Sequence, residues 1–266
     1  MNCIIYGNCQ AQYFLKILNL SQNFKKIYKK IEHVINYELI ENAEKFLPSS
    51  ISNADLFIYQ PLNNNHDKLS TNYILNNVLK PNCQKISFPY IYNSAIWIFD
   101  KKGDYKKIFE DLFKNEYSLE SILTKFKNLE IDFNFKNRFQ NTMNILKKRE
   151  LETDIKTHDY ILNNFRKKKL FISEPHPTIH VYYHCIIQIF KILNLKNDLT
   201  FELASTMLHS DRAYKLHFGL IEKILKTPYD INYYKFEWKQ SPDNNWFKFY
   251  SEIIKKIYLE TFSMNN

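Results

Sequence analysis

The chain has 266 residues, a formal net charge of +9 and 45% apolar side chains. This length and apolar content are enough for a substantial core, so a wholly disordered chain is excluded. Nearly all of the positive charge is lysine, and the scarcity of arginine argues against a sequence reader of nucleic acid. The charge balance fits a phosphate-bearing small molecule better.

The cysteine pattern indicates the cell compartment. The four cysteines form no CxxC pair, and their spacing does not match a zinc site. They do not suggest a disulfide framework, so we expect a cytoplasmic protein with free thiols. The N-terminus lacks the basic stretch and long apolar region of a signal peptide. No run approaches the roughly 18–20 apolar residues that a membrane span requires.

The first part of the chain alternates predicted strands and helices. Apolar runs predict strands at residues 2–6, 31–37, 54–61 and 85–90. The segments between them predict helices at 11–20, 38–47 and 69–79. This rhythm is typical of an α/β fold in which helices flank a parallel sheet.

From Asp104 onward the pattern becomes mainly helical. Helical periodicity covers 104–128 and 137–166, a short strand is predicted at 170–173, and an apolar helix follows at 178–194. The remainder, to Asn266, predicts helices separated by Pro228 and Pro242.

We found no internal repeat and no flexible linker, so a single domain over residues 1–266 is the simplest organisation. Its α/β core would comprise about 1–100 plus 167–195, and its helical elaboration about 101–166 and 196–266.

The segment Gly7-Asn8-Cys9-Gln10 follows the first predicted strand and opens a helix. A glycine permits a sharp turn there, and the helix start offers unpaired N–H groups that favour thiolate over thiol. Asn8 and Gln10 carry amides that could donate to an oxyanion, although both could equally be structural. We therefore predict an activated cysteine, or at least an anion pocket, at this turn.

His176 is the best candidate base. It follows the strand at 170–173 and precedes a helix, so we expect it at the same sheet edge as Cys9. A base of this kind needs an orienting group. Glu174 would point elsewhere if the strand continued, and the sequence does not choose between Asp159 and Asp55; we take Asp159 as the expected partner.

Two other patterns have a functional and a structural interpretation. The spacing of His176, His180 and His184 could hold a metal on one helix face, but Pro177 places His176 before the helix, so we expect no metal. Lys167, Lys168 and Lys169 are typical of a solvated surface, although they could attract a phosphate; we predict Lys168 and Lys169 as cofactor-binding residues.

The two motifs also resemble a known family. Gly7-Asn8-Cys9-Gln10 after an N-terminal strand resembles the opening of the WcbI-type polysaccharide biosynthesis proteins of bacterial capsule loci. A second block runs through Asp159-Tyr160-Ile161, Asn164-Phe165 and Leu170-Phe171 to His176-Pro177-Thr178, and resembles that family's C-terminal signature. The likeness covers most of the chain.

This resemblance implies a coenzyme A-binding acyltransferase, with acetyl-coenzyme A as donor and a sugar hydroxyl of a capsular or other surface polysaccharide as acceptor. It implies Cys9 and His176 as the active pair, with Asn8 and Gln10 beside the acyl group and Gly7 at the turn. The architecture is similar to the SGNH hydrolases and to Rossmann-like sheets. Two alternatives remain: an esterase or deacetylase on the same fold, and a non-catalytic module that binds coenzyme A or a glycan.

Overall fold

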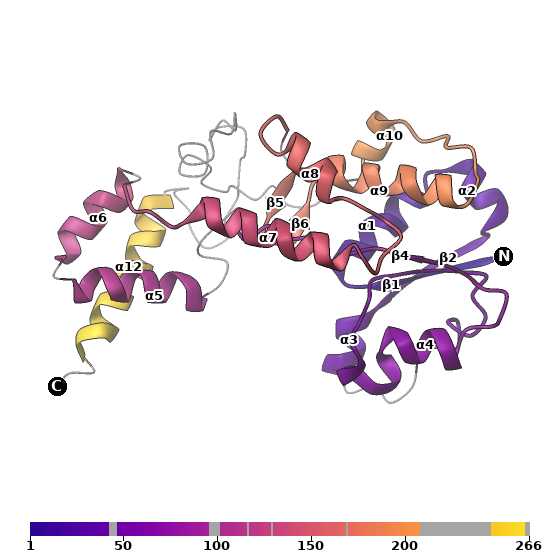
Figure 1. Ribbon diagram of the computed structural model, residues 1–266, viewed down its shortest axis with the longest axis horizontal. Helices are drawn as coiled ribbons and strands as arrows, with labels where there is room; N and C mark the ends of the chain where they lie inside the picture. Colours follow the sequence, from indigo (N-terminus) through magenta and orange to yellow (C-terminus); the bar gives the residue numbers. More distant parts are fainter. Residues whose placement is uncertain are drawn as a thin grey trace. The chain divides into compact units, whose positions relative to one another are not determined.

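The structure is a computed structural model that describes residues 1–42, 47–95, 102–115, 117–128, 130–168, 170–207 and 246–263. The chain divides into two compact units (Figure 1). The first comprises Met1–Ile91, Met143–Asn164 and His176–Asp211, and the second comprises Tyr92–Thr142, Phe165–Pro175 and Arg212–Asn266. Residues 143–164, expected in the helical elaboration, therefore belong to the unit that contains the sheet.

The first unit is built on a four-stranded parallel sheet with the strand order β2–β1–β3–β4. The strands are β1 (Asn2–Gly7), β2 (Lys30–Ile35), β3 (Leu56–Tyr59) and β4 (Gln84–Ser87). The strand order reverses between β1 and β3, and ligands of open parallel sheets bind outside the carboxyl ends at such a point. The predicted α/β class with a parallel sheet is confirmed.

Helices cover both faces of this sheet, which explains why β1 is a continuous buried apolar run. Figure 1 shows α1 (Cys9–Leu18) and α9 (Ile179–Ile192) on one face and α3 (Asn36–Glu41) and α4 (Thr71–Asn77) on the other. On the first face, the Phe14 ring packs edge-on against Phe88 and Tyr182. On the second, Tyr6 and Phe57 belong to a buried apolar cluster.

The remaining elements of the first unit are short. The helix α2 (Gln22–Ile27) begins at Ser21, whose hydroxyl accepts from the N–H of Phe24. A 3₁₀ helix, η1 (Asn64–Leu69), lies between β3 and α4, and α10 (Phe201–Ser205) follows α9. Periodicity did not predict α2 or η1, because each is too short for a helical pattern to develop, whereas α10 lies in the C-terminal stretch that was predicted to be helical.

The long helical pattern at 137–166 is interrupted. The helix α7 ends at Arg149 (Phe135–Arg149), and α8 begins eight residues after Glu150 (His158–Asn164). The buried Glu150 carboxylate accepts hydrogen bonds from the backbone N–H groups of Thr157 and His158. It thereby satisfies free N–H groups at the start of α8, as a helix cap does.

The second unit is mainly helical, with α5 (Lys102–Lys114), α6 (Leu119–Lys127), α7 as far as Thr142, and α12 (Trp246–Ser263). Its core is aromatic, with the rings of Phe109, Phe126 and Phe133 in mutual contact. Ser118 caps α6, which breaks the pattern expected over 104–128. The helix expected after Pro242 is present as α12, and residues 208–245, which contain both prolines, lie outside the described residues.

Two short strands flank the turn before α9. The strand predicted at 170–173 is present as β5 (Phe171–Ser173), but it is not one of the four strands of the parallel sheet. A two-residue strand, β6 (His176–Pro177), follows it. Among the described residues, no helix combines the length and apolar character needed to cross a bilayer.

Candidate active site at the carboxyl edge of the sheet

The turn after β1 brings Cys9 to the start of α1. Asn8 is the N-cap, and its Oδ1 accepts a hydrogen bond of 2.9 Å from the N–H of Gln10. A Cβ on Gly7 would lie 3.0 Å from the Ala11 Cβ and 3.2 Å from the Phe88 ring. Gly7 does not have a positive φ. These distances confirm that a side chain here would clash at the turn, so the glycine admits the close approach of α1 to the sheet.

The structure brings Cys9 and His176 together. The Cys9 Sγ lies 3.8 Å from the His176 Nε2, although the two residues are 167 positions apart. His176 is the first residue of β6, and this strand directly precedes Thr178, the N-cap residue of α9. Both side chains are only partly buried, so small molecules can reach them. This geometry allows a proton to pass from sulfur to nitrogen.

The electrostatics of this pair differ from expectation. Burial raises the pKa of the Cys9 thiol, and the N–H groups of Cys9 and Gln10, which lower it, do not outweigh that effect. Burial also lowers the pKa of His176. Desolvation outweighs the helix terminus here, and its direction is opposite to the one expected for an activated thiol. The pair rests as a neutral thiol beside a neutral imidazole.

Gln10 holds two loops together. Its side chain is 1% exposed, its amide donates to the Ile91 carbonyl, and its Oε1 accepts from the Ile91 N–H at 3.1 Å. The Gln60 amide also donates to that oxygen, at 3.4 Å. These contacts tie the start of α1 to the chain beyond β4. Of the two roles that the sequence left open for Gln10, these contacts favour the structural one, because the backbone of Ile91 engages both ends of the amide.

His33 is a residue of the site that sequence reasoning missed. It lies in β2, and its Nε2 is 3.2 Å from the Gly7 carbonyl oxygen. Burial lowers its pKa, so the ring is neutral near pH 7 and its N–H donates to that carbonyl. It thereby supports the backbone directly before Asn8 and Cys9. The available sequence signal was the alternation of apolar and polar residues over 31–37, which includes His33. This alternation placed a polar histidine side chain on the strand that pairs with β1.

A cavity of about 360 Å³ lies at this edge, and we call it the proximal cavity. Asn8, Asn36, Gln60 and Pro89 each follow a different strand of the sheet and line its wall. Other lining residues bring aromatic rings and a cation: Tyr37, Tyr90 and Arg149. Arg149 donates to the Tyr90 carbonyl at 3.0 Å and lies over the Tyr90 ring. The cavity combines amides, rings and a guanidinium beside the residue that precedes Cys9.

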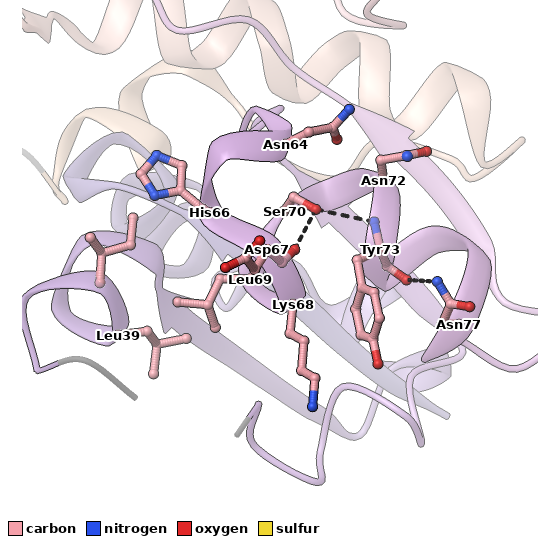
Figure 2. Close-up of a pocket in the computed structure, with 11 residues that line it drawn as sticks. Leu39, Asn64, His66, Asp67, Lys68, Leu69, Ser70, Asn72, Tyr73 and Asn77 are labelled. Atoms are coloured by element: carbon pink, nitrogen blue, oxygen red, sulfur yellow. Dashed lines mark hydrogen bonds between the residues drawn. The ribbon is translucent and has the colours of Figure 1, made fainter. Parts of the chain in front are cut away.

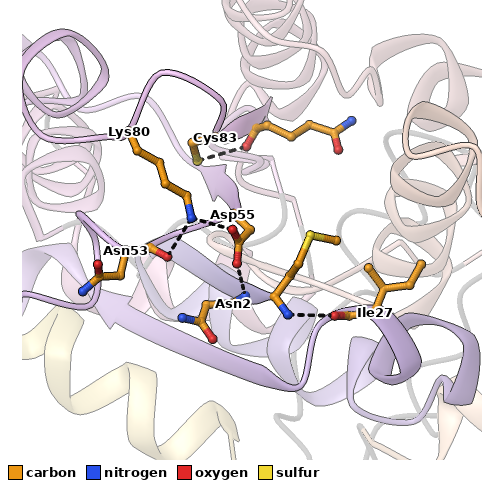
Figure 3. A network of polar contacts seen from close by, with 8 residues as sticks. Asn2, Ile27, Asn53, Asp55, Lys80 and Cys83 are labelled. Atoms are coloured by element: carbon orange, nitrogen blue, oxygen red, sulfur yellow. Dashed lines mark hydrogen bonds and ion pairs between the residues drawn. The ribbon is translucent and has the colours of Figure 1, made fainter.

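The two acidic candidates have other partners. The Asp159 side chain is 91% exposed, and its carboxylate pairs with the His158 ring at 2.8 Å. This position differs from the buried one expected for an orienting group. Asp55 lies at the amino end of β3, where it accepts from the Asn2 N–H at 2.6 Å and pairs with Lys80 (Figure 3). That is the edge of the sheet opposite to Cys9, so Asp55 is excluded as the partner of His176.

The predicted lysines and the other two histidines of the helix pattern are not part of the pair described above. Lys168 is exposed and belongs to the second unit, and Lys169 lies outside the described residues. His180 stacks on Phe201 and His184 stacks on Tyr160, so these rings belong to aromatic packing. Across the described ranges, no three His, Cys, Asp or Glu side chains are grouped to hold a metal ion.

Fold and geometry together define an α/β protein with a cysteine–histidine pair at the carboxyl edge of a parallel sheet. The family model of the polysaccharide biosynthesis enzyme WcbI matches residues 2–198, a range that contains both members of the pair. The chain therefore belongs to the WcbI family, and the resemblance predicted from its two motifs is confirmed.

A solved structure of WcbI, described as a novel polysaccharide biosynthesis enzyme, has a similar fold. The TM-score is 0.57 at 17% sequence identity, and the match covers 98% of this chain and 94% of that one. That structure is described as the native protein without a disulfide bond between coenzyme A and one of its cysteines. Comparison with curated proteins gave no significant match.

Proposed function

We propose that this protein is a coenzyme A-dependent acyltransferase that transfers an acyl group, with acetyl as the first candidate, to a sugar hydroxyl of a surface polysaccharide. One observation carries the proposal: a thiol and an imidazole lie 3.8 Å apart at the ligand-binding edge of the sheet. Membership of a polysaccharide biosynthesis family supports the acceptor class. The coenzyme A named for the WcbI structure of similar fold supports the donor class.

The first half-reaction forms an acyl-enzyme. His176 Nε2 takes the proton from Cys9 Sγ as the sulfur attacks the carbonyl carbon of the acyl-coenzyme A thioester. The tetrahedral intermediate then expels the coenzyme A thiolate, which receives the proton from the imidazolium. A C–S bond to Cys9 replaces the C–S bond to coenzyme A, so the step is nearly balanced in energy.

The second half-reaction transfers the acyl group to the sugar. His176 takes the proton of a sugar hydroxyl as that oxygen attacks the carbonyl carbon of acyl-Cys9. Cys9 leaves as a thiolate and recovers the proton from the imidazolium, which restores the resting pair. Neutral imidazole is the form required at the start of both half-reactions, and its lowered pKa keeps it in that form at pH 7.

The surroundings of the pair suggest how the substrates bind. Asn8 lines the proximal cavity and directly precedes Cys9, so it is our candidate donor to the developing oxyanion. A volume of about 360 Å³ is too small for a whole coenzyme A molecule, so the cavity would receive the acyl group and the acceptor sugar. Lys168 and Lys169 remain our candidates for the phosphates of the donor.

Trapping the acyl-enzyme tests the covalent route. The protein is mixed with acetyl-coenzyme A alone, and its intact mass is measured by mass spectrometry with the wild type, Cys9→Ala and His176→Gln side by side. We expect one added acetyl group on the wild type, none on Cys9→Ala, and slow addition to His176→Gln. If Cys9→Ala transfers acetyl to an acceptor at the wild-type rate, direct transfer with His176 as base replaces the covalent route.

The rival functions give different results. A hydrolase releases acetate at the same rate with and without a glycan acceptor. A binding module raises the melting temperature with coenzyme A, because the ligand binds only the folded state, yet shows no turnover and no effect of His176→Gln. An absence of any thermal shift at millimolar coenzyme A would contradict the proposed donor.

A further inference from the structure

A second and larger cavity adjoins the first. It has a volume of about 810 Å³, and we call it the distal cavity. Ile40 of α3 lines both cavities, so their walls are continuous along this helix. The other walls of the distal cavity come from η1 and α4 (Figure 2). A chain-like ligand whose reacting unit lies in the proximal cavity can therefore extend into the distal one.

The side chains of the distal cavity suit a neutral, hydroxyl-rich ligand. Asn64, Asn72 and Asn77 each bring an amide, which both donates and accepts, as a sugar hydroxyl does. His66 and Tyr73 bring half-buried rings that can cover the apolar C–H face of a sugar (Figure 2).

The charge of the distal cavity argues against a nucleotide. Its described lining holds one lysine, Lys68, beside one aspartate, Asp67, so their charges offset each other. The nucleotide end of coenzyme A carries several phosphate charges, which need a net positive site. The two cavities therefore differ in character, and the distal one fits uncharged sugar units better than the donor.

The wall of the distal cavity is held in a defined shape. Asp67 has φ 45° and ψ −120°, a conformation that costs a non-glycine residue about 1–3 kcal/mol. Ser70 fixes this turn, because its hydroxyl and its N–H both donate to the Asp67 carbonyl, at 2.6 Å and 3.0 Å. The same hydroxyl caps α4 by accepting from the N–H of Tyr73. The backbone that carries the amides and rings is thus held in place before a ligand arrives.

We propose that the distal cavity binds the neutral sugar units that adjoin the acylated one, so that the acceptor is an oligosaccharide or polymer rather than a free monosaccharide. This inference rests on the proposed function for the identity of the reaction, but its test is a binding measurement. It adds a subsite, and a preference for acceptor length, to the Cys9 site.

The experiment measures binding of neutral oligosaccharides to the full chain carrying Cys9→Ala, by saturation-transfer NMR and calorimetry. The probes are malto-, cello- and chito-oligosaccharides of one, two and four units. We expect four-unit probes of at least one series to bind about tenfold more tightly than the monosaccharide, since one or two additional hydrogen bonds give that ratio.

Two variants test whether the tighter binding of the longer probes depends on the distal cavity. Tyr73→Ala and Asn64→Ala should each remove most of the length dependence and leave monosaccharide binding unchanged, because each removes one of the rings or amides that line the distal cavity. Asn64 is exposed, so Asn64→Ala should fold as well as the parent and provides the test if Tyr73→Ala is unstable. Tyr117→Ala, at an exposed tyrosine outside the cavity, is the matched control and should change nothing.

Three outcomes would overturn the inference. The first is equal affinity for one and four units in every series. The second is length dependence that survives both distal variants. The third is displacement of the oligosaccharide by adenosine 3′,5′-bisphosphate in a manner that depends on Tyr73, which would assign the cavity to the donor. Failure of acyl transfer in a protein that still shows the length dependence would contradict the proposed function alone.

Discussion

The His33 ring supports the backbone of the Cys9 turn from a neighbouring strand, with its Nε2 3.2 Å from the Gly7 carbonyl oxygen. The Gly7 carbonyl that accepts this hydrogen bond directly precedes Asn8 and Cys9. The bond therefore limits how the turn can move when Cys9 attacks. We predict that His33→Ala lowers kcat for acyl transfer about tenfold, the equivalent of one buried hydrogen bond, and changes the KM for the donor little. Steady-state kinetics check this split.

His33→Gln is the conservative variant, since its amide can also donate to the Gly7 carbonyl. It should recover much of the kcat lost in His33→Ala. If both variants keep wild-type kcat and only the melting temperature falls, His33 is structural and has no part in positioning the turn.

The neutral state of the Cys9–His176 pair predicts a distinct pH dependence. His176 acts as a base only when unprotonated, and burial holds its pKa below the usual value of about 6.5. The acid limb of kcat/KM should therefore lie below pH 6.5, with activity lost as the pH falls through it. A limb above pH 7 would show that the imidazole is stabilised in its charged form.

Alkylation by iodoacetamide checks the state of the thiol itself. Burial raises the pKa of Cys9, so its rate of alkylation should rise about tenfold per pH unit from pH 7 to 8.5. The buried Cys3, Cys83 and Cys185 serve as internal controls and should stay unmodified in the folded protein. A rate independent of pH down to pH 5 would indicate a thiolate–imidazolium pair instead.

Gln10 is predicted to act on stability more than on chemistry. Gln10→Leu leaves the buried N–H and carbonyl of Ile91 without their partner, which costs about 2–4 kcal/mol of the free energy of unfolding. Below its melting temperature the variant should keep kcat within about fivefold of wild type, because the Ile91 backbone engages both ends of the amide. Denaturant titration and steady-state kinetics measure the two quantities.

Gln12→Leu is the matched control for Gln10→Leu, because Gln12 lies in the same helix and is exposed. It should change the free energy of unfolding by less than about 0.5 kcal/mol. The opposite result for Gln10→Leu, with unchanged stability and a kcat about a hundredfold or more lower, would restore the oxyanion role that the sequence suggested.

Parts of the candidate active site could be predicted from the sequence, because they depend on patterns within a few neighbouring residues. The strand before Gly7 is an uninterrupted apolar run, and the helix after Cys9 shows its period within a few residues, so the βα turn and its thiol were predictable. The same holds for the histidine before α9, because Pro177 marks the helix start.

Other parts depend on contacts between distant residues. The link from Gln10 to Ile91 spans 81 positions, and no local pattern in either segment announces it. Burial likewise decides the pKa of Cys9, and burial depends on which elements pack over the turn. Asp159 was chosen from its motif alone, and its carboxylate is 91% exposed because α8 presents it to solvent.

The Tyr182 hydroxyl leads to the last prediction. Tyr182 is 0% exposed, stacks on the Tyr13 ring at 4.8 Å, and lies close enough to Cys9 for the two to interact electrostatically. Within the described part of the chain, its hydroxyl has no hydrogen-bond partner. A buried hydroxyl without a partner costs free energy, so Tyr182→Phe should leave stability unchanged or raise it by up to about 1 kcal/mol.

Tyr183→Phe is the matched control on the adjacent residue, because the Tyr183 hydroxyl donates to the Leu199 carbonyl at 2.9 Å. Removing that bond should lower the free energy of unfolding by about 1 kcal/mol, opposite in sign to Tyr182→Phe. Burial raises the pKa of Tyr182 well above its usual value, so its phenol stays protonated and can donate when a substrate carbonyl approaches Cys9. If Tyr182→Phe is as stable as predicted and its kcat falls about tenfold or more, the hydroxyl serves the reaction; unchanged kcat would restrict Tyr182 to packing between α1 and α9.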